Sequence, residues 1–161
     1  MRSCVSKQLF YTWTDQSFRD FMMQLLTNLE PYQEFAQTVI VSELQEYNEI
    51  IFVQKGKIQI GFEINKQRKY CIQQNDRSII GAYGVTWNYR AQYIYFASTI
   101  VQGFFIRKRN WIEILDNGGE VIPVLKKNIL LDYLTKIKLK VEIAKKRSIE
   151  DFQLRNDHEM I

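Results

Sequence analysis

The chain has 161 residues, of which 46% are apolar and 25% charged, enough for one domain with a buried core. Its two cysteines and single histidine argue against a disulfide framework, a metal site and histidine-dependent catalysis. The N-terminus lacks the apolar run of a signal peptide, and no apolar stretch reaches the roughly 20 residues that span a bilayer. We therefore expect a non-enzymatic domain in a reducing compartment.

The first expected element is an amphipathic helix at residues 15–29. Asp15 is a suitable N-cap, and the apolar side chains behind it recur at spacings of three and four. Pro31 is expected to end this helix, because proline cannot continue the hydrogen-bond ladder. Residues 1–14 then form a lead-in outside the domain.

From Thr38 onward, apolar residues recur with a period of two, which predicts short strands. Turn residues separate them at intervals of about eight to twelve residues, a spacing typical of antiparallel barrels and sandwiches. Residues 54–57 contain Gly56 and are predicted to form a tight hairpin turn, and the polar residues 65–68 to reverse the chain again. The expected strands are centred on residues 39–41, 50–52, 58–63, 70–72, 79–80, 93–98 and 102–106.

Helical periodicity returns at Asn110, where Glu113 three residues later completes the pattern of a capping box. This short helix is expected to end before Gly118. A longer helix is predicted at about 121–147, because apolar residues step by three and four along it, and residues 148–161 remain as a tail.

The order of elements predicts a mainly β, α+β domain at residues 15–147. We expect an antiparallel β-roll or jelly roll of about eight strands, with one N-terminal helix and two C-terminal helices.

Four segments add detail to this prediction: NEIIFVQKGKIQIGF at 48–62, IIGAYG at 79–84, RAQYIYFAS at 90–98 and GFFIRKRNW at 103–111. Together with the element order, they resemble the family of cyclic-nucleotide-binding domains, a β-roll capped by helices. The first three are similar to the family's signature hairpin, its Phe-Gly-Glu turn and its Arg-small-Ala-x-Val segment. The fourth looks most like voltage-gated channels of the ether-à-go-go and hyperpolarisation-activated type.

The resemblance implies a site for cAMP or cGMP. In family members that bind nucleotide, backbone N–H groups of the glycine turn and an arginine hold the cyclic phosphate, and a glutamate accepts from the ribose hydroxyl. Here Gly81 matches the turn glycine and Arg90 the arginine, but Ala82 replaces the glutamate, a loss of about 1.5 to 3 kcal/mol. The residues expected at the site are Gly81, Ala82, Tyr83, Arg90, Ala91 and Gln92.

Each of these residues also has a simpler interpretation. Gly81 can serve only to permit positive φ in a turn, and Arg90 can be a surface arginine beside a strand. Tyr83 and the neighbouring aromatics could stack on a purine, but packing considerations favour their filling the cavity. Gln92 replaces the alanine whose backbone approaches the phosphate in the family.

A second segment, DFQLR at 151–155, resembles the peptide that some ether-à-go-go channels insert into their own empty nucleotide cavity. In that interpretation, Phe152 and Leu154 would be an intrinsic ligand beneath Gly81.

The net charge of +4 is concentrated near the C-terminus, where the cations between 126 and 147 face only Asp132 and Glu142. Solvent is the usual neighbour of such a helix face, and an anionic membrane surface is the alternative.

The resemblance implies a cytosolic regulatory domain of a voltage-gated potassium channel, at the cytoplasmic face of a membrane, with weak or no nucleotide binding. Its partners would be the transmembrane pore of the same channel and, in a tetramer, its own copies. The alternative is a functional cAMP or cGMP sensor of a channel or of a soluble regulatory protein. We expect no nucleic-acid partner, because too few residues follow Arg147 for a helix-turn-helix, and no cofactor other than a cyclic nucleotide.

Overall fold

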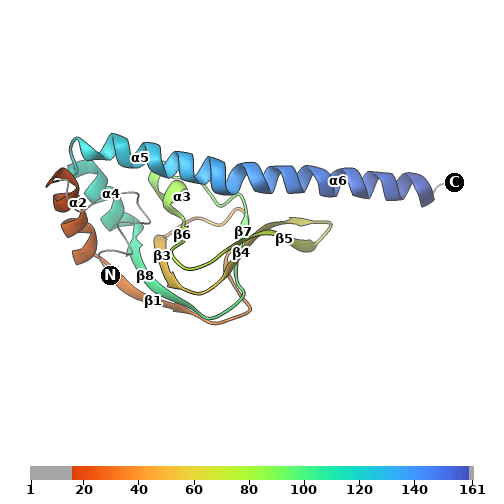
Figure 1. The fold of residues 1–161 in the computed structure, drawn as a ribbon, viewed down its shortest axis with the longest axis horizontal. Helices are drawn as coiled ribbons and strands as arrows, with labels where there is room; N and C mark the ends of the chain where they lie inside the picture. The colour runs from red at the N-terminus through yellow and green to blue at the C-terminus, as the bar shows by residue number, and fades with distance from the viewer. Residues whose placement is uncertain (1–15, 160–161) are drawn as a thin grey trace.

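The computed structural model describes residues 16–159 (Figure 1). Two four-stranded antiparallel sheets form a roll, with helices at one end and along one edge. This confirms the expected mainly β, α+β fold with eight strands. The first sheet has the order β1 (Glu30–Glu34), β8 (Val101–Arg107), β3 (Glu49–Lys55) and β6 (Ile79–Ile80). The second has the order β2 (Thr38–Val41), β7 (Ile94–Ala97), β4 (Ile58–Ile64) and β5 (Gln67–Gln74).

The link between β3 and β4 corrects one prediction. These strands do not pair, because β3 lies between β6 and β8 whereas β4 lies between β5 and β7. Residues 54–57 therefore carry the chain from one sheet to the other, with Gly56 at φ 122°. A β-carbon on Gly56 would lie 2.6 Å from the carbonyl oxygen of Ile100, so the glycine is required by a close crossing and not by a hairpin.

The turn between β4 and β5 is a hairpin, as predicted. Its two central residues, Asn65 and Lys66, both have positive φ, 51° and 61°. This conformation suits two-residue hairpin loops, because its twist matches that of the flanking strands.

The N-terminal helix α2 (Gln16–Thr27) is shorter than expected, and Asp15 lies outside the described residues. Pro31 does not simply end the helix: it lies within β1, paired with Phe104 of β8. Strand β1 was not predicted, because its residues do not alternate between apolar and polar. Its position at the edge of the sheet tolerates a proline, whose missing N–H would otherwise break a ladder.

Helix α4 (Lys108–Asn117) begins two residues before the predicted capping box. Arg107 occupies the N-cap position and makes no side-chain cap bond, so Asn110 is not the cap. Trp111 of this helix is fully buried, and its ring meets that of Phe21 edge-on at 6.0 Å. Its indole N–H donates to Thr86 over 3.1 Å, so the polar atom of this core residue is also satisfied.

A continuous helix runs along one edge of the roll as α5 (Val121–Asp132), the π-helical turn η1 (Tyr133–Lys138) and α6 (Leu139–Glu159) (Figure 1). It extends beyond the predicted end at residue 147, and residues 148–159 continue it past the roll beyond β5. Within the described residues, no helix is apolar over a length that could cross a membrane. Those residues also contain no cluster of metal-binding side chains.

The buried tryptophan generates the first prediction. We expect Trp111→Ala to lower the free energy of unfolding by about 3–5 kcal/mol, because it opens a cavity between α2 and α4. Phe35→Ala is the control, since that ring is 72% exposed and its loss should cost less than about 0.5 kcal/mol. Urea denaturation measures both, and equal effects would contradict this account of the core.

Candidate functional site

The glycine turn and short helix expected from the resemblance are present after β6. Gly81 has φ 88°, and α3 (Ala82–Trp87) follows it directly. The N–H of Val85 donates to the carbonyl of Gly81, and the N–H of Tyr89 donates to that of Gly84. These bonds shape residues 81–89 into one tight helical turn.

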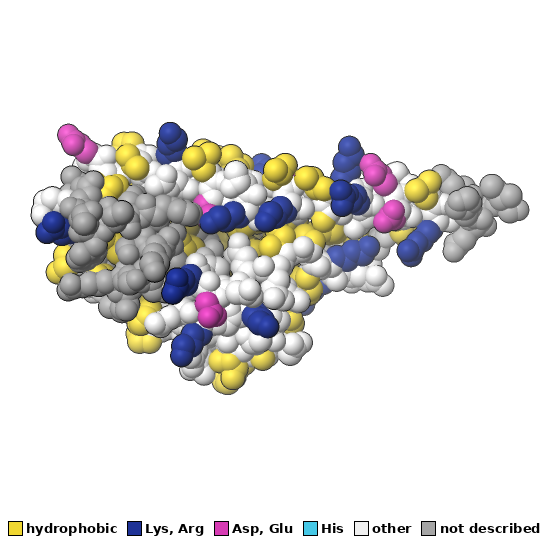
Figure 2. Space-filling view, viewed as in Figure 1, with side chains coloured by type: hydrophobic (Ala, Val, Ile, Leu, Met, Phe, Trp, Pro, Cys, Tyr) yellow, Lys and Arg dark blue, Asp and Glu magenta, His cyan; other side chains and the backbone are white. Residues whose placement is uncertain are grey.

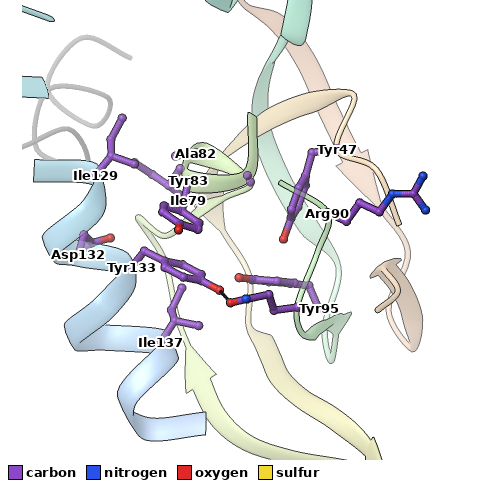
Figure 3. Close-up of a pocket in the computed structure, with 13 residues that line it drawn as sticks. Tyr47, Ile79, Ala82, Tyr83, Arg90, Tyr95, Ile129, Asp132, Tyr133 and Ile137 are labelled. Carbon is purple, nitrogen blue, oxygen red and sulfur yellow. Dashed lines mark hydrogen bonds between the residues drawn. The ribbon is translucent and has the colours of Figure 1, made fainter. Parts of the chain in front are cut away.

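A small cavity lies between this turn and the long helix (Figure 3). Its volume is about 30 Å³. That is room for one or two water molecules, whereas pockets that bind small molecules have volumes of about 300–1,000 Å³. The space between the glycine turn and the long helix is therefore small, and the aromatic side chains that line it occupy most of this region.

Tyr47 fills the part nearest the glycine turn. A β-carbon on Gly84 would lie 2.3 Å from Cδ2 of Tyr47, and one on Gly81 would lie 2.9 Å from Cδ1. The ring of Tyr47 therefore rests directly on the turn, and only glycine leaves room for it. Tyr95 lies beside Tyr47 and also lines the cavity (Figure 3).

The long helix closes the other side. Tyr133 of η1 stacks on Tyr83 of α3, with ring centroids 4.1 Å apart and an interplanar angle of 6°. Its hydroxyl donates to Oε1 of Gln92 over 2.5 Å. Ile129 and Ile137, one turn away on either side, also line the cavity (Figure 3). The helix is thus held to the glycine turn through one tyrosine.

Arg90 does not point into the cavity. Its guanidinium extends away from it (Figure 3) and pairs with Glu46 over 3.0 Å, with 64% of the Arg90 side chain exposed. Ala91 is buried, and its N–H donates to the carbonyl of Gln45. This amide is therefore occupied within the protein. Surface pairs of this kind contribute little to stability, so the ion pair itself is a weak restraint on Arg90.

The structure thus divides the six predicted site residues. Gly81, Ala82, Tyr83 and Gln92 line the cavity, and Arg90 lies at its rim. The backbone N–H of Ala91 is bonded to Gln45 and does not face the cavity.

The expected intrinsic ligand is not found in the cavity. Phe152 and Leu154 lie near the end of α6, with 48% and 59% of their surface exposed. Because helix α6 continues through residues 151–155, these side chains are carried away from the glycine turn along the helix axis. In this structure Tyr47 and Tyr133 take the place that had been expected for them.

Three residues that fill the cavity, Tyr47, Tyr95 and Tyr133, were not predicted. Tyr47 precedes the NEIIF segment in a loop without periodicity, and Tyr95 was read only as a strand residue. Tyr133 lies on the apolar row of the long helix together with Ile129 and Ile137, a spacing of four that could have identified it as facing the roll.

Burial raises the pKa of the tyrosines around the cavity. The pKa of Tyr95 lies well above its ordinary value near 10, first because the side chain is buried and then because Tyr47 is close. Burial likewise raises the pKa of Tyr47 and of Tyr133. All three are therefore neutral hydrogen-bonding groups at physiological pH.

Comparison with known proteins supports the fold. No protein-family model and no curated protein matches the chain. Among solved structures, a cyclic-nucleotide-binding domain from Methylobacillus flagellatus is similar with TM-score 0.65 and 14% identity, over 93% of this chain and 83% of that one. The regulatory domain of Toxoplasma gondii PKA, crystallised with cAMP, gives TM-score 0.62 and 10% identity, over 70% of this chain. The chain has the cyclic-nucleotide-binding fold.

A third structure with this fold is the regulatory subunit of a cAMP-independent protein kinase A from Trypanosoma brucei. It is 19% identical, with TM-score 0.57, over 71% of this chain and 40% of that one. The chain also spans only 42% of the Toxoplasma protein. The cyclic-nucleotide-binding fold therefore also occurs within larger proteins.

The contact between Tyr47 and the glycine turn generates the second prediction. Gly84→Ala should lower the free energy of unfolding by about 1–3 kcal/mol, because the new methyl group would overlap the Tyr47 ring. In a Tyr47→Ala background the same change should cost clearly less, because the overlap with the ring is gone and only the contact with the backbone oxygen of Tyr89, 3.0 Å away, remains. Urea denaturation of the four proteins measures this coupling, and additive effects would contradict the contact.

The raised tyrosine pKa values generate the third prediction. Above about pH 10 the unfolded chain loses tyrosine protons that the folded domain keeps, so the free energy of unfolding should fall as pH rises. Below that pH the contribution is fully present. Tyr133→Phe removes one such proton. The free energy of unfolding should therefore fall less steeply between about pH 10 and pH 11.5, by a slope that corresponds to roughly one proton. Urea denaturation at several pH values tests this, and an unchanged slope would contradict it.

Proposed function

We propose that this domain is a non-enzymatic regulatory scaffold with weak or no binding of cyclic nucleotides. The observation that carries the proposal is the cavity of about 30 Å³ where the fold's nucleotide site is expected. A nucleotide could enter only if Tyr47 and Tyr133 left their places. Their displacement would break the stack of Tyr133 on Tyr83, the hydrogen bond of Tyr133 to Gln92 and the contact of Tyr47 with the glycine turn.

The polar groups that would compensate for that displacement are missing or directed elsewhere. Ala82 has no carboxylate for a ribose hydroxyl, and the Arg90 guanidinium pairs with Glu46 at the surface. The Ala91 amide donates within the protein. The Trypanosoma brucei protein belongs to a cAMP-independent kinase, which supports a role for this fold without cAMP.

The scaffold has a direct mechanical connection to the long helix. Tyr133 joins this helix to the glycine turn, and Glu142 of α6 accepts from the Tyr93 hydroxyl over 2.6 Å. A movement of the helix must break these contacts or carry the roll with it. The domain would thus hold the helix in one position without any ligand.

The finer proposal is a cytosolic domain of a voltage-gated potassium channel, acting on the pore of the same channel within a tetramer at the cytoplasmic face of a membrane. Its support is the similarity of residues 103–111, which form the end of β8 and the start of α4, to channel sequences. The retained Gly81 turn and α3 favour the alternative, a functional cAMP or cGMP sensor.

Calorimetric titration with cAMP and with cGMP distinguishes these functions and is the fourth prediction. We expect no binding, or dissociation constants weaker than about 1 mM. Ala82→Glu restores the missing carboxylate and is the informative variant. Because the cavity would stay filled, it should not bind measurably either.

Binding of either nucleotide at sub-micromolar concentration by the unaltered protein would overturn the proposal and favour the sensor. Strong binding by Ala82→Glu alone would show that the missing carboxylate, and not the filled cavity, prevents binding. Circular dichroism and thermal melting confirm that each variant is folded.

A further inference from the structure

The outer face of the long helix has no partner among the described residues. Its inner row, Ile129, Tyr133, Ile137 and Val141, is buried on the roll. On the opposite side large apolar residues are exposed, and Figure 2 shows them along the outer edge of the helix with Lys and Arg beside them. Their exposed fractions are 47% for Val124, 48% for Leu131, 59% for Leu139 and 46% for Ile143.

These residues form one row because of the π-helical turn. Val124 and Leu131 are seven residues apart, which is two α-helical turns. Leu139 follows eight residues later, and the extra residue in η1 keeps it on the same side. Ile143 is one further turn along α6. We call this row, together with the cations beside it, the outer face.

The helix segment that carries the outer face is strongly positive. Seven lysines and one arginine lie between residues 126 and 147, with only two acids. Both acids are engaged: Asp132 pairs with Lys136 over 2.6 Å, and Glu142 accepts from Tyr93. Among the described residues no carboxylate pairs with Lys127, Lys140 or Lys146. The chemistry that complements this face is apolar in the centre and anionic at the sides.

A second copy of the chain does not supply that chemistry. Two outer faces in contact would bring the same lysines together, including Lys127, which lies between Val124 and Leu131, and Lys146, which follows Ile143. Like charges in contact destabilise a helix pair. A homodimer through this face would therefore leave its positive charge uncompensated.

An anionic lipid surface does supply it. The segment from 121 to 147 is about 40 Å long at 1.5 Å per residue, and it forms a straight edge of the molecule (Figure 1). An edge that is straight along the helix axis can touch a flat surface along its whole length. A groove in a protein would instead have to fit the helix side chains at each position. Helices with an apolar row flanked by lysines bind at the boundary between headgroups and acyl chains.

We infer that the outer face of α5, η1 and α6 docks on an anionic phospholipid membrane. Leu131, Leu139 and Ile143 enter the headgroup boundary, and the flanking lysines contact lipid phosphates and carboxylates. This site is separate from the filled cavity, which lies on the inner side of the same helix. Membrane docking therefore does not depend on whether the cavity binds nucleotide.

Co-sedimentation of the full chain with lipid vesicles tests this inference and is the fifth prediction. We expect binding to vesicles of phosphatidylcholine with phosphatidylserine, little binding to phosphatidylcholine alone, and weakening by salt. Replacing Lys127, Lys140 and Lys146 by Gln should lower the partition coefficient by roughly fivefold per charge, about 100-fold in total. Leu139→Gln with Ile143→Gln should weaken binding at both low and high salt.

The control replaces Lys55, Lys57 and Lys66 by Gln. These exposed lysines lie in the turns of the roll, and their replacement changes the net charge by the same amount. Binding should change by less than about threefold, the contribution of distant charges that are screened by salt.

Four outcomes would overturn the inference. The first is absence of phosphatidylserine-dependent binding, and the second is that the control substitutions reduce vesicle binding as much as those at Lys127, Lys140 and Lys146. The third is a dimer in analytical ultracentrifugation that Leu139→Gln with Ile143→Gln abolishes. That result would assign the face to a second copy of the chain. The fourth is binding to soluble poly-glutamate as tight as to vesicles and insensitive to the Leu139 and Ile143 changes, which would indicate an acidic protein partner.

Discussion

The contact between the Tyr47 ring and the backbone of Gly81 and Gly84 is the constraint on which the candidate site depends. Because neither glycine has a side chain, the ring can rest on the turn that would otherwise face a ligand. The same turn that resembles a phosphate cradle thus serves as the seat of a tyrosine. Once Tyr47 occupies it, the cavity that remains has a volume of about 30 Å³.

The position of the long helix follows from how this space is filled. Tyr133 reaches Tyr83 and Gln92 from a row in which buried residues recur every four positions. In an α-helix that spacing turns by about 40° at each step and would rotate the row away from the roll. The π-helical turn winds more residues per turn and keeps Tyr133 and Ile137 over the cavity. It also aligns the outer face, so one local irregularity organises both sides of the helix.

The two sides of this helix therefore present different chemistry. The inner side is apolar and aromatic and is bound to the roll, with both acids of the segment engaged close to it. The outer side carries an exposed apolar row with lysines beside it, in a segment that has seven lysines and one arginine against two acids. Because the roll holds the inner side, the outer side remains available for a surface that the helix can follow along its length.

The sequence by itself determined the fold class and most strand positions, because period-two and period-three-to-four patterns report directly which residues must be buried. Its resemblance to cyclic-nucleotide-binding domains indicated the glycine turn at residues 81–84. The same resemblance showed that Ala82 stands where the family has a glutamate. The sequence placed residues 54–57 in a hairpin wrongly, since a glycine turn looks the same whether the next strand pairs or crosses to another sheet. Only the tertiary structure decided that Tyr47 and Tyr133, 86 residues apart in the chain, line the same cavity, and that Arg90 pairs with Glu46. The reason is that contacts between distant segments leave no periodic pattern in either segment.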